Sequence, residues 1–414
     1  MSGLFDAATA IVLFIVVLGA LVLFHEAGHF ITARLARVRV LEFGFGFPPR
    51  AKVLHERPVD PEIAASWERQ HAEALAQAGD DPEQIALVEA MPRPVGMQYT
   101  LNWLPIGGFV KLEGEDGDQE EDQHSFGRAP LWKKLLILVM GVVMNLVLSV
   151  AIFGGIAFFG APQIGIKFAT VEPGSPAAAA GLAVSDTIVS INGQQYDFYR
   201  GTYGDGNILD HIRADAGQTV QLGVIHADGT HATLTVTLRP QADVDAGKGA
   251  LGIKAGPDGF LPVILPGTTS RPLGESASIG WQETTHWFNA IFDALGTLGN
   301  AIVNHPTEAP PVSGPVGIAG QLGQTFRDEG PIMTLYVAGI LSANLALVNV
   351  LPFPPLDGGR MLVIVLKAIP RYGRRISQRA EQATYAIGFL ALFGFLIWVT
   401  FFDIARGLGG GGTP

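Results

Sequence analysis

The chain has 414 residues, of which 48% are hydrophobic and only 16% are charged, and its net charge is −11. Soluble domains carry about 25% charged residues, so this composition favours a membrane protein, and the acidic balance excludes a basic surface for nucleic acid. Cysteine is absent, which excludes disulfides, a thiol nucleophile and a cysteine-bound metal.

The first predicted membrane helix covers residues 7–33, with no charge between Asp6 and His25. A span needs about 20 mostly apolar residues. A cleaved signal peptide is disfavoured, because the positive charges follow the apolar run instead of preceding it.

This helix contains an H-E-x-x-H motif at residues 25–29. Helical geometry places His25 and His29 one turn apart on one face, where they can bind one zinc ion, with Glu26 beside them to take a proton from water. Ionisable groups within a span are costly and indicate function. The alternative is that the apolar run ends before His25 and the motif is ordinary surface polarity.

Two acidic segments follow. Residues 55–95 are predicted to form a helical cytoplasmic insertion, for which the sequence suggests no function. Residues 113–122 carry seven carboxylates and are predicted to be a solvated, flexible loop, with a cation site as the alternative.

A second span is predicted after Lys133 and Lys134, and the chain then stays uncharged from Leu135 to Ile166. Residues 163–255 change to alternating polar and β-branched residues, with hairpin turns expected at 192–193 and 228–229. The segment TVEPGSPAAAAGLAVSDTIVSING (170–193) resembles a bacterial-type PDZ domain. Such domains add a peptide strand to a sheet edge; the alternative is a domain that only filters substrates by size.

Residues 274–303 are predicted to form an amphipathic helix whose apolar side suits a membrane interface. This side carries six large side chains: Trp281, Trp287, Phe288, Ile291, Phe292 and Leu295. We expect His286, in the same stretch, to be an interfacial residue and not a metal ligand.

The third uncharged stretch, from Gly330 to Leu356, leads into NVLPFPPLDGGR (349–360). A catalytic zinc usually has three protein ligands, so the two histidines require one more. Prolines break the helix here, and irregular backbone at membrane depth is tolerated only within protein or beside water. Asp357 in this break is the predicted third ligand; the alternative is that it caps the next helix.

A fourth span is predicted from Gln382 to Phe402. Lys and Arg gather after the first span, before the second, and between the third and fourth. By the positive-inside rule these loops are cytoplasmic, so both termini and the segment between spans two and three lie outside.

These motifs together resemble the RseP-type site-2 proteases, a family of intramembrane zinc metalloproteases with a PDZ domain. The resemblance implies that Asp357 is the third zinc ligand and that Asn349, in N-x-x-P-x-x-x-L-D-G, helps to hold the substrate. FGFGFPPR (43–50) and YTLNWLPIGGFVKLEGE (99–115) resemble the family's membrane-associated β region, where Gly107 and Gly108 allow close approach of a substrate strand. GVVMN (141–145) resembles a G-x-x-x-N element whose role stays open, with helix packing as the alternative.

The expected fold is a polytopic α-helical membrane protein with about four transmembrane helices, an inserted extracytoplasmic α+β PDZ domain and a membrane-associated β region. The predicted domains, in chain order, are the first transmembrane helix with H-E-x-x-H (1–38), a cytoplasmic and membrane-associated β region with the acidic helical insertion (39–130), the second transmembrane helix (131–162), the PDZ domain (163–256), a periplasmic amphipathic helix and linker (257–328), the third transmembrane segment with N-x-x-P-x-x-x-L-D-G (329–368), and a cytoplasmic loop, fourth transmembrane helix and tail (369–414).

The resemblance implies a Zn²⁺ metalloendopeptidase of the bacterial inner membrane that performs regulated intramembrane proteolysis. Its substrates would be single-span membrane proteins such as anti-sigma factors, and also signal-peptide remnants. Expected partners are these substrates, membrane lipid and a PDZ peptide ligand, with no nucleic acid. The alternatives are a catalytically inactive membrane PDZ scaffold and a transporter, which also uses broken helices but usually shows repeated halves.

Overall fold

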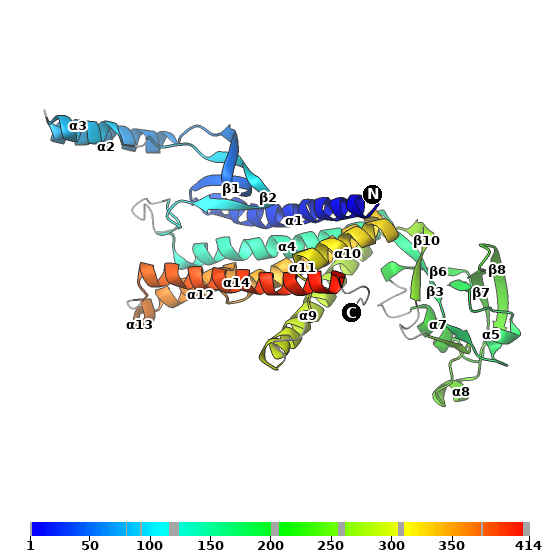
Figure 1. Cartoon of the computed structure of the whole chain (residues 1–414). Helices are drawn as coiled ribbons and strands as arrows, with labels where there is room; N and C mark the ends of the chain where they lie inside the picture. Colours follow the sequence, from blue (N-terminus) through cyan, green and yellow to red (C-terminus); the bar gives the residue numbers. More distant parts are fainter. Residues whose placement is uncertain are drawn as a thin grey trace. The chain divides into compact units, whose positions relative to one another are not determined.

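The computed structural model describes residues 2–79, 81–91, 93–115, 124–199, 207–255, 261–304, 310–373 and 376–408. The chain divides into two compact units. The first comprises Met1–Ser149, His286–Asp328 and Val337–Pro414, and the second comprises Val150–Thr285 and Glu329–Tyr336. The first unit holds most of the membrane helices, and the second holds a β domain (Figure 1).

Within the described residues, four helices are long and apolar enough to cross a membrane. They are α1 (Ser2–Leu35), α4 (Leu131–Phe159), α11 (Pro331–Val350) and α14 (Gln378–Leu408). Large apolar side chains on α1 and α14, such as Val16 and Ile387, are more than 60% exposed, as lipid-facing positions would be. The chain is therefore a membrane protein with four candidate spans, as predicted.

The third span is shorter than its uncharged stretch suggests, because α11 ends at Val350. Pro352, Pro354 and Pro355 follow and cannot continue a helix, since proline has no N–H to donate. The chain turns through residues 351–356 and then begins α12 (Asp357–Ala368), followed by the short α13 (Pro370–Gly373).

The β region consists of β1 (Val40–Glu56) and β2 (Gln98–Leu112), which pair antiparallel with several register shifts. The first part of β1 lies opposite the end of β2, as in the pair Phe45–Gly108, and its last part lies opposite the start of β2, as in the pair Glu56–Gln98. An apolar cluster packs this region against α1 and α4; its buried members are Ala33, Val38, Val40, Leu112, Phe126, Ile137 and Leu138.

The insertion after β1 contains α2 (Pro61–Ala78) and α3 (Pro82–Glu89), which extend away from the strands (Figure 1). Both helices begin with Asp-Pro-Glu: the aspartate, Asp60 or Asp81, accepts a hydrogen bond from the backbone two residues on, and proline occupies the first helical position. In the acidic segment that follows β2, residues 116–122 lie outside the described residues. Its first two carboxylates are not free in solvent, because Glu113 pairs with Arg39 and Glu115 with Arg360.

The second unit contains an antiparallel six-stranded sheet in the order β10-β3-β6-β5-β7-β8, with β4 and β9 paired separately. The strands are β3 (Ala161–Lys167), β4 (Thr170–Val171), β5 (Thr187–Ile191), β6 (Gln194–Asp197), β7 (Thr219–Ile225), β8 (His231–Thr237), β9 (Ile253–Lys254) and β10 (Leu261–Thr269). Where the structure describes this domain, the short helices α5 (Pro176–Ala179), α7 (Ile208–Ala214) and α8 (Gln241–Asp245) accompany the sheet.

Both predicted hairpin turns are present in this domain. Asn192 and Gly193, with φ of 50° and 79°, join β5 to β6, and Gly229, with φ of 82°, lies in the turn between β7 and β8. The sheet extends beyond the expected boundaries of 163 and 256, because β3 begins at Ala161 and β10 lies in the expected linker. β10 contains two prolines, which an edge strand tolerates.

The predicted amphipathic helix is α9 (Leu273–Asn304), and Trp281 and Phe292 on its apolar side are about 60% exposed. α10 (Pro315–Asp328) follows, and its Gly323 lies so close to α1 that a Cβ there would come within 2.5 Å of Ala10. The buried carboxylate of Asp403, near the end of α14, accepts hydrogen bonds from the backbone N–H groups of Gly314 and Gly317, at the start of α10. It therefore acts as a cap supplied by a distant part of the chain.

Candidate metal centre

Helix α1 carries the two histidines of the H-E-x-x-H motif towards the interior of the first unit. The helix continues unbroken to Leu35, and His25 and His29 are only 6% and 8% exposed. The motif is therefore not surface polarity at the end of an apolar run. The two ring centroids lie 4.7 Å apart, as one helical turn allows.

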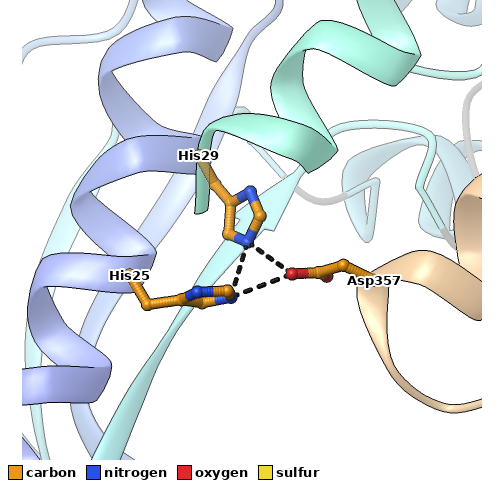
Figure 2. A group of neighbouring side chains, drawn as sticks. All are labelled: His25, His29 and Asp357. Carbon is orange, nitrogen blue, oxygen red and sulfur yellow. Dashed lines mark hydrogen bonds and ion pairs between the residues drawn. The ribbon is translucent and has the colours of Figure 1, made fainter. Parts of the chain in front are cut away.

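Asp357 reaches the histidines from the first residue of α12. The N-cap position of that helix is Leu356, and no side chain caps it, so Asp357 does not serve as the predicted alternative cap. Gly358 and Gly359 permit the tight turn, since a Cβ on either would come within 2.2–2.5 Å of the preceding backbone. One carboxylate oxygen of Asp357 thereby lies 2.9 Å from Nε2 of His25 and 3.3 Å from Nε2 of His29 (Figure 2).

These three donor atoms suit a tetrahedral zinc ion. The two Nε2 atoms are 3.1 Å apart, so the three sides of the triangle measure 2.9, 3.1 and 3.3 Å. Ligand atoms bound to zinc at about 2.0–2.1 Å in tetrahedral geometry lie about 3.3–3.4 Å from one another, and two His with one carboxylate is a usual catalytic zinc set. The site therefore needs only a slight opening to accept the ion.

The protonation of the rings also favours a cation between them. Nδ1 of His29 lies 2.8 Å from the carbonyl oxygen of Ile137, which can only accept, so this nitrogen carries the ring hydrogen. In the neutral ring, Nε2 of His29 then carries no hydrogen, and its lone pair points at the other imidazole and the carboxylate. Among the described residues no group donates a hydrogen bond to Oδ2 of Asp357, although this atom is buried. Converging lone pairs without a donor are stabilised by a metal ion.

Helix α4 supplies the surface against which both rings rest. A Cβ on Gly141 would lie 2.5 Å from Cε1 and Nε2 of His29 and 2.7 Å from Cε1 of His25. On the opposite side, a Cβ on Gly28 of α1 would lie 2.3 Å from the carbonyl oxygen of Met140. The two glycines thus let α1 and α4 approach closely enough for the rings to fit between them.

Two amides lie next to the second ring nitrogen of His25. Nδ2 of Asn145 is 3.3 Å and Nδ2 of Asn349 is 3.5 Å from Nδ1 of His25. Asn349, predicted to hold substrate, is therefore at the metal centre, on α11 and half-buried. The sequence left the role of the G-x-x-x-N element open and did not include Asn145 among the site residues, although its spacing of four from Gly141 was the available signal.

Glu26 and the two glycines of β2 are neighbours. A Cβ on Gly108 would lie 3.8 Å from Cγ of Glu26, and a Cβ on Gly107 would lie 3.3 Å from Val22 on the same helix. Gly107 has φ of +88°, which favours glycine. The strand that was predicted to pair with substrate thus runs past the H-E-x-x-H motif.

Beyond Asp357, α12 lines a cavity of about 440 Å³ together with α4, α14 and the segment after β2. Arg360, one turn along α12, forms an ion pair with Glu115 at 2.6 Å. This contact ties the helix that carries Asp357 to the end of the β region.

Two helix-borne histidines, an adjacent glutamate and a carboxylate from another helix are the functional groups of a zinc hydrolase, here within a membrane protein. The sequence profile of peptidase family M50 matches residues 13–57 and 90–395, and the chain belongs to that family. The match omits 58–89, the segment that forms α2 and α3.

Relatives of similar length agree with this assignment. The zinc metalloprotease RasP of Geobacillus kaustophilus is 28% identical over 97% of this chain and 99% of its own length. Proteins from Clostridium perfringens and Nostoc, whose names include the words zinc metalloprotease, are 28% and 26% identical, each over 93% of this chain and over 95% and 93% of their own lengths. The chain is a zinc metalloprotease, and the predicted resemblance to the site-2 proteases is confirmed.

Proposed function

We propose that this protein cleaves single-span membrane proteins at or within the lipid bilayer, as regulated intramembrane proteolysis requires. The observation that carries the proposal is the position of the metal centre. Its two histidines lie in the second half of a helix that is apolar enough to span a membrane, and its aspartate follows the short turn (351–356) at the end of another such helix.

In this proposal His25, His29 and Asp357 hold the zinc ion and Glu26 is the catalytic acid and base. Zinc bound there supplies Lewis acidity, which lowers the pKa of water and polarises a peptide carbonyl. The Glu26 carboxylate accepts the proton of the attacking water and then delivers it to the nitrogen of the leaving amine. Glu26 is half-buried and lies beside Gly108, so its carboxylate is close to β2, the strand that is proposed to pair with substrate.

Substrate binding would use extended backbone. A helical substrate hides its carbonyl groups in its own hydrogen bonds, so it must unwind before it can be cut. The Gly107–Gly108 segment of β2 offers backbone without side chains for strand pairing, and the Asn349 amide offers a polar contact at the metal centre.

The β domain of the second unit is proposed to be a PDZ domain that binds a peptide or filters substrates by size. Its Pro-Gly-Ser-Pro-Ala segment begins α5, where the Ser175 hydroxyl accepts a hydrogen bond from the Ala178 N–H. The Asp186 carboxylate accepts a hydrogen bond from the backbone N–H of Ala183 and is hydrogen-bonded to the ring of His226. These contacts give the residues that carry the PDZ resemblance a defined structural role.

The distribution of Lys and Arg supports an orientation in which both termini and the β domain are periplasmic. The proposed location is the bacterial inner membrane, with membrane lipid as a partner and with anti-sigma-factor-like proteins and signal-peptide remnants as substrates.

The test is co-expression with candidate single-span proteins, followed by mapping of new termini by mass spectrometry. We expect wild-type protein to generate a new terminus within or next to the substrate's span. Glu26→Gln should retain zinc and generate none, because the amide cannot accept the proton. Glu68→Gln makes the same change on the exposed surface of α2 and should behave as wild type. Cleavage by Glu26→Gln at the wild-type rate would refute the proposed role.

A further inference from the structure

The element GVVMN (141–145) contains a buried polar side chain that the proposed function does not use. Asn145 is completely buried, and its amide oxygen has no hydrogen-bond partner among the described residues. Leaving a buried amide oxygen without a hydrogen bond lowers the stability of the fold, so a hydrogen-bond donor is expected close to this oxygen.

The neighbouring group is the imidazole of His25. Its Nδ1 lies 3.3 Å from Nδ2 of the Asn145 amide. His25 offers Nε2 to Asp357 and His29, where the zinc ion would lie, so in the neutral ring the hydrogen is on Nδ1 and this atom is a donor. A donor beside the NH₂ group of an amide makes no hydrogen bond. The two ends of an amide are nearly the same size, and a half-turn of the side chain puts the partnerless oxygen against the ring N–H.

Helix α4 already provides a hydrogen-bond acceptor for the other zinc-binding histidine, His29. Nδ1 of His29 donates to the backbone oxygen of Ile137 at 2.8 Å. Ile137, Gly141 and Asn145 are spaced by four and therefore share one face of α4. On that face, Ile137 accepts the hydrogen bond from His29, Gly141 lies against both rings, and Asn145 lies beside His25.

We propose that Asn145 is a positioning residue of the zinc site: its amide oxygen accepts the hydrogen bond from Nδ1 of His25 and so fixes the tautomer and the orientation of that ligand. The inference rests on the proposed ligand set. It leaves Asn349, the half-buried amide 3.5 Å from the same ring, to contact substrate. Hydrogen-bond partners of ligating histidines typically change metal affinity by about 10- to 100-fold when removed.

The test measures zinc affinity of the purified full-length protein by competition with a chromophoric chelator, with the metal alone and no substrate. Asn145→Leu keeps the size of the side chain but offers no acceptor, and we expect zinc to bind roughly 10- to 100-fold more weakly. Asn145→Asp offers an acceptor at either end and should hold zinc at least as tightly as wild type. If Asn145→Leu does not fold, Asn145→Ala carries the same expectation.

Ser149→Ala is the matched control for packing. Ser149 lies one turn further along the same face of α4, is equally buried and donates a hydrogen bond to the backbone oxygen of Gly339. The Ser149→Ala variant should leave zinc affinity unchanged.

Three results would overturn the inference. The first is wild-type affinity in the variants that lack an acceptor at 145. The second is an equal loss in Ser149→Ala, which would indicate packing alone. The third is failure of Asn145→Asp to hold zinc. Zinc binding by His25→Ala at wild-type affinity would refute the ligand set itself, and loss of cleavage with unchanged zinc affinities would count only against the proposed proteolysis.

Discussion

Replacing Gly141 by alanine should displace both histidine ligands at once. The added Cβ would lie 2.5 Å from the His29 ring and 2.7 Å from the His25 ring, whereas ordinary contact begins at 3.4 Å. The His29 ring must therefore retreat by about 0.9 Å, the difference between 3.4 and 2.5 Å, if α4 stays in place. Metal sites tolerate only about 0.2 Å in ligand distances.

We expect Gly141→Ala to weaken zinc binding by more than about 100-fold, the upper end of the loss seen when ligand partners are disturbed, and to abolish cleavage. Overpacking of this kind also costs roughly 1–3 kcal/mol of stability. The assay is zinc content after dialysis against a chelator of known affinity, together with the thermal midpoint of unfolding.

Gly155→Ala provides the control on the same helix, because a Cβ there would meet nothing within 4 Å. Alanine favours a helix over glycine by about 1 kcal/mol, so this variant should retain zinc and be as stable as wild type or more so. The reasoning fails if Gly141→Ala retains stoichiometric zinc and wild-type activity.

Three further outcomes are expected. Asp403→Ala removes the cap of α10 and should lower the free energy of unfolding by about 1–2 kcal/mol in thermal melts, with zinc content unchanged; an unaltered midpoint would contradict the capping role. Gly107→Ala, at φ +88°, should keep zinc but reduce kcat/KM for a model substrate roughly tenfold, equivalent to ~1.4 kcal/mol; equal loss in zinc content would assign Gly107 to the fold instead. Hydrogen bonds from Lys254 and then Arg239 lower the pKa of Glu172 in the folded protein, so the Glu172 ion pairs stabilise the fold above the ordinary pKa of 4.5 and this stabilisation is lost as pH falls through the lower folded value. The difference in melting temperature between wild type and Glu172→Gln should therefore vanish in acid. A difference that grows in acid would contradict the ion pairs.

The sequence predicted those features that depend on local pattern. The four membrane helices follow from the length of the apolar stretches, and the pairing of His25 with His29 follows from helical spacing. The turn at Asn192-Gly193 follows from the preference of these residues for positive φ. In each case the neighbours along the chain determine the structure.

Contacts between distant segments could not be predicted from the same patterns. Gly141 and Asn145 have a visible spacing of four, but their task depends on which helix packs against that face of α4. Asp403 directly follows the predicted fourth span, and nothing in the sequence indicates that its partners are the N–H groups of Gly314 and Gly317. β10 was expected to be part of a linker, and it forms a strand because it pairs with the distant β3 at the edge of the sheet, where its two prolines are tolerated.

The account depends on one zinc ion bound by His25, His29 and Asp357. Zinc-edge X-ray absorption of the purified protein tests this most directly. We expect one zinc per chain with two imidazole nitrogens and at least one oxygen at about 2.0–2.2 Å, and loss of one imidazole contribution in His25→Ala. Absence of zinc, or a zinc surrounded by oxygen alone, would contradict the account.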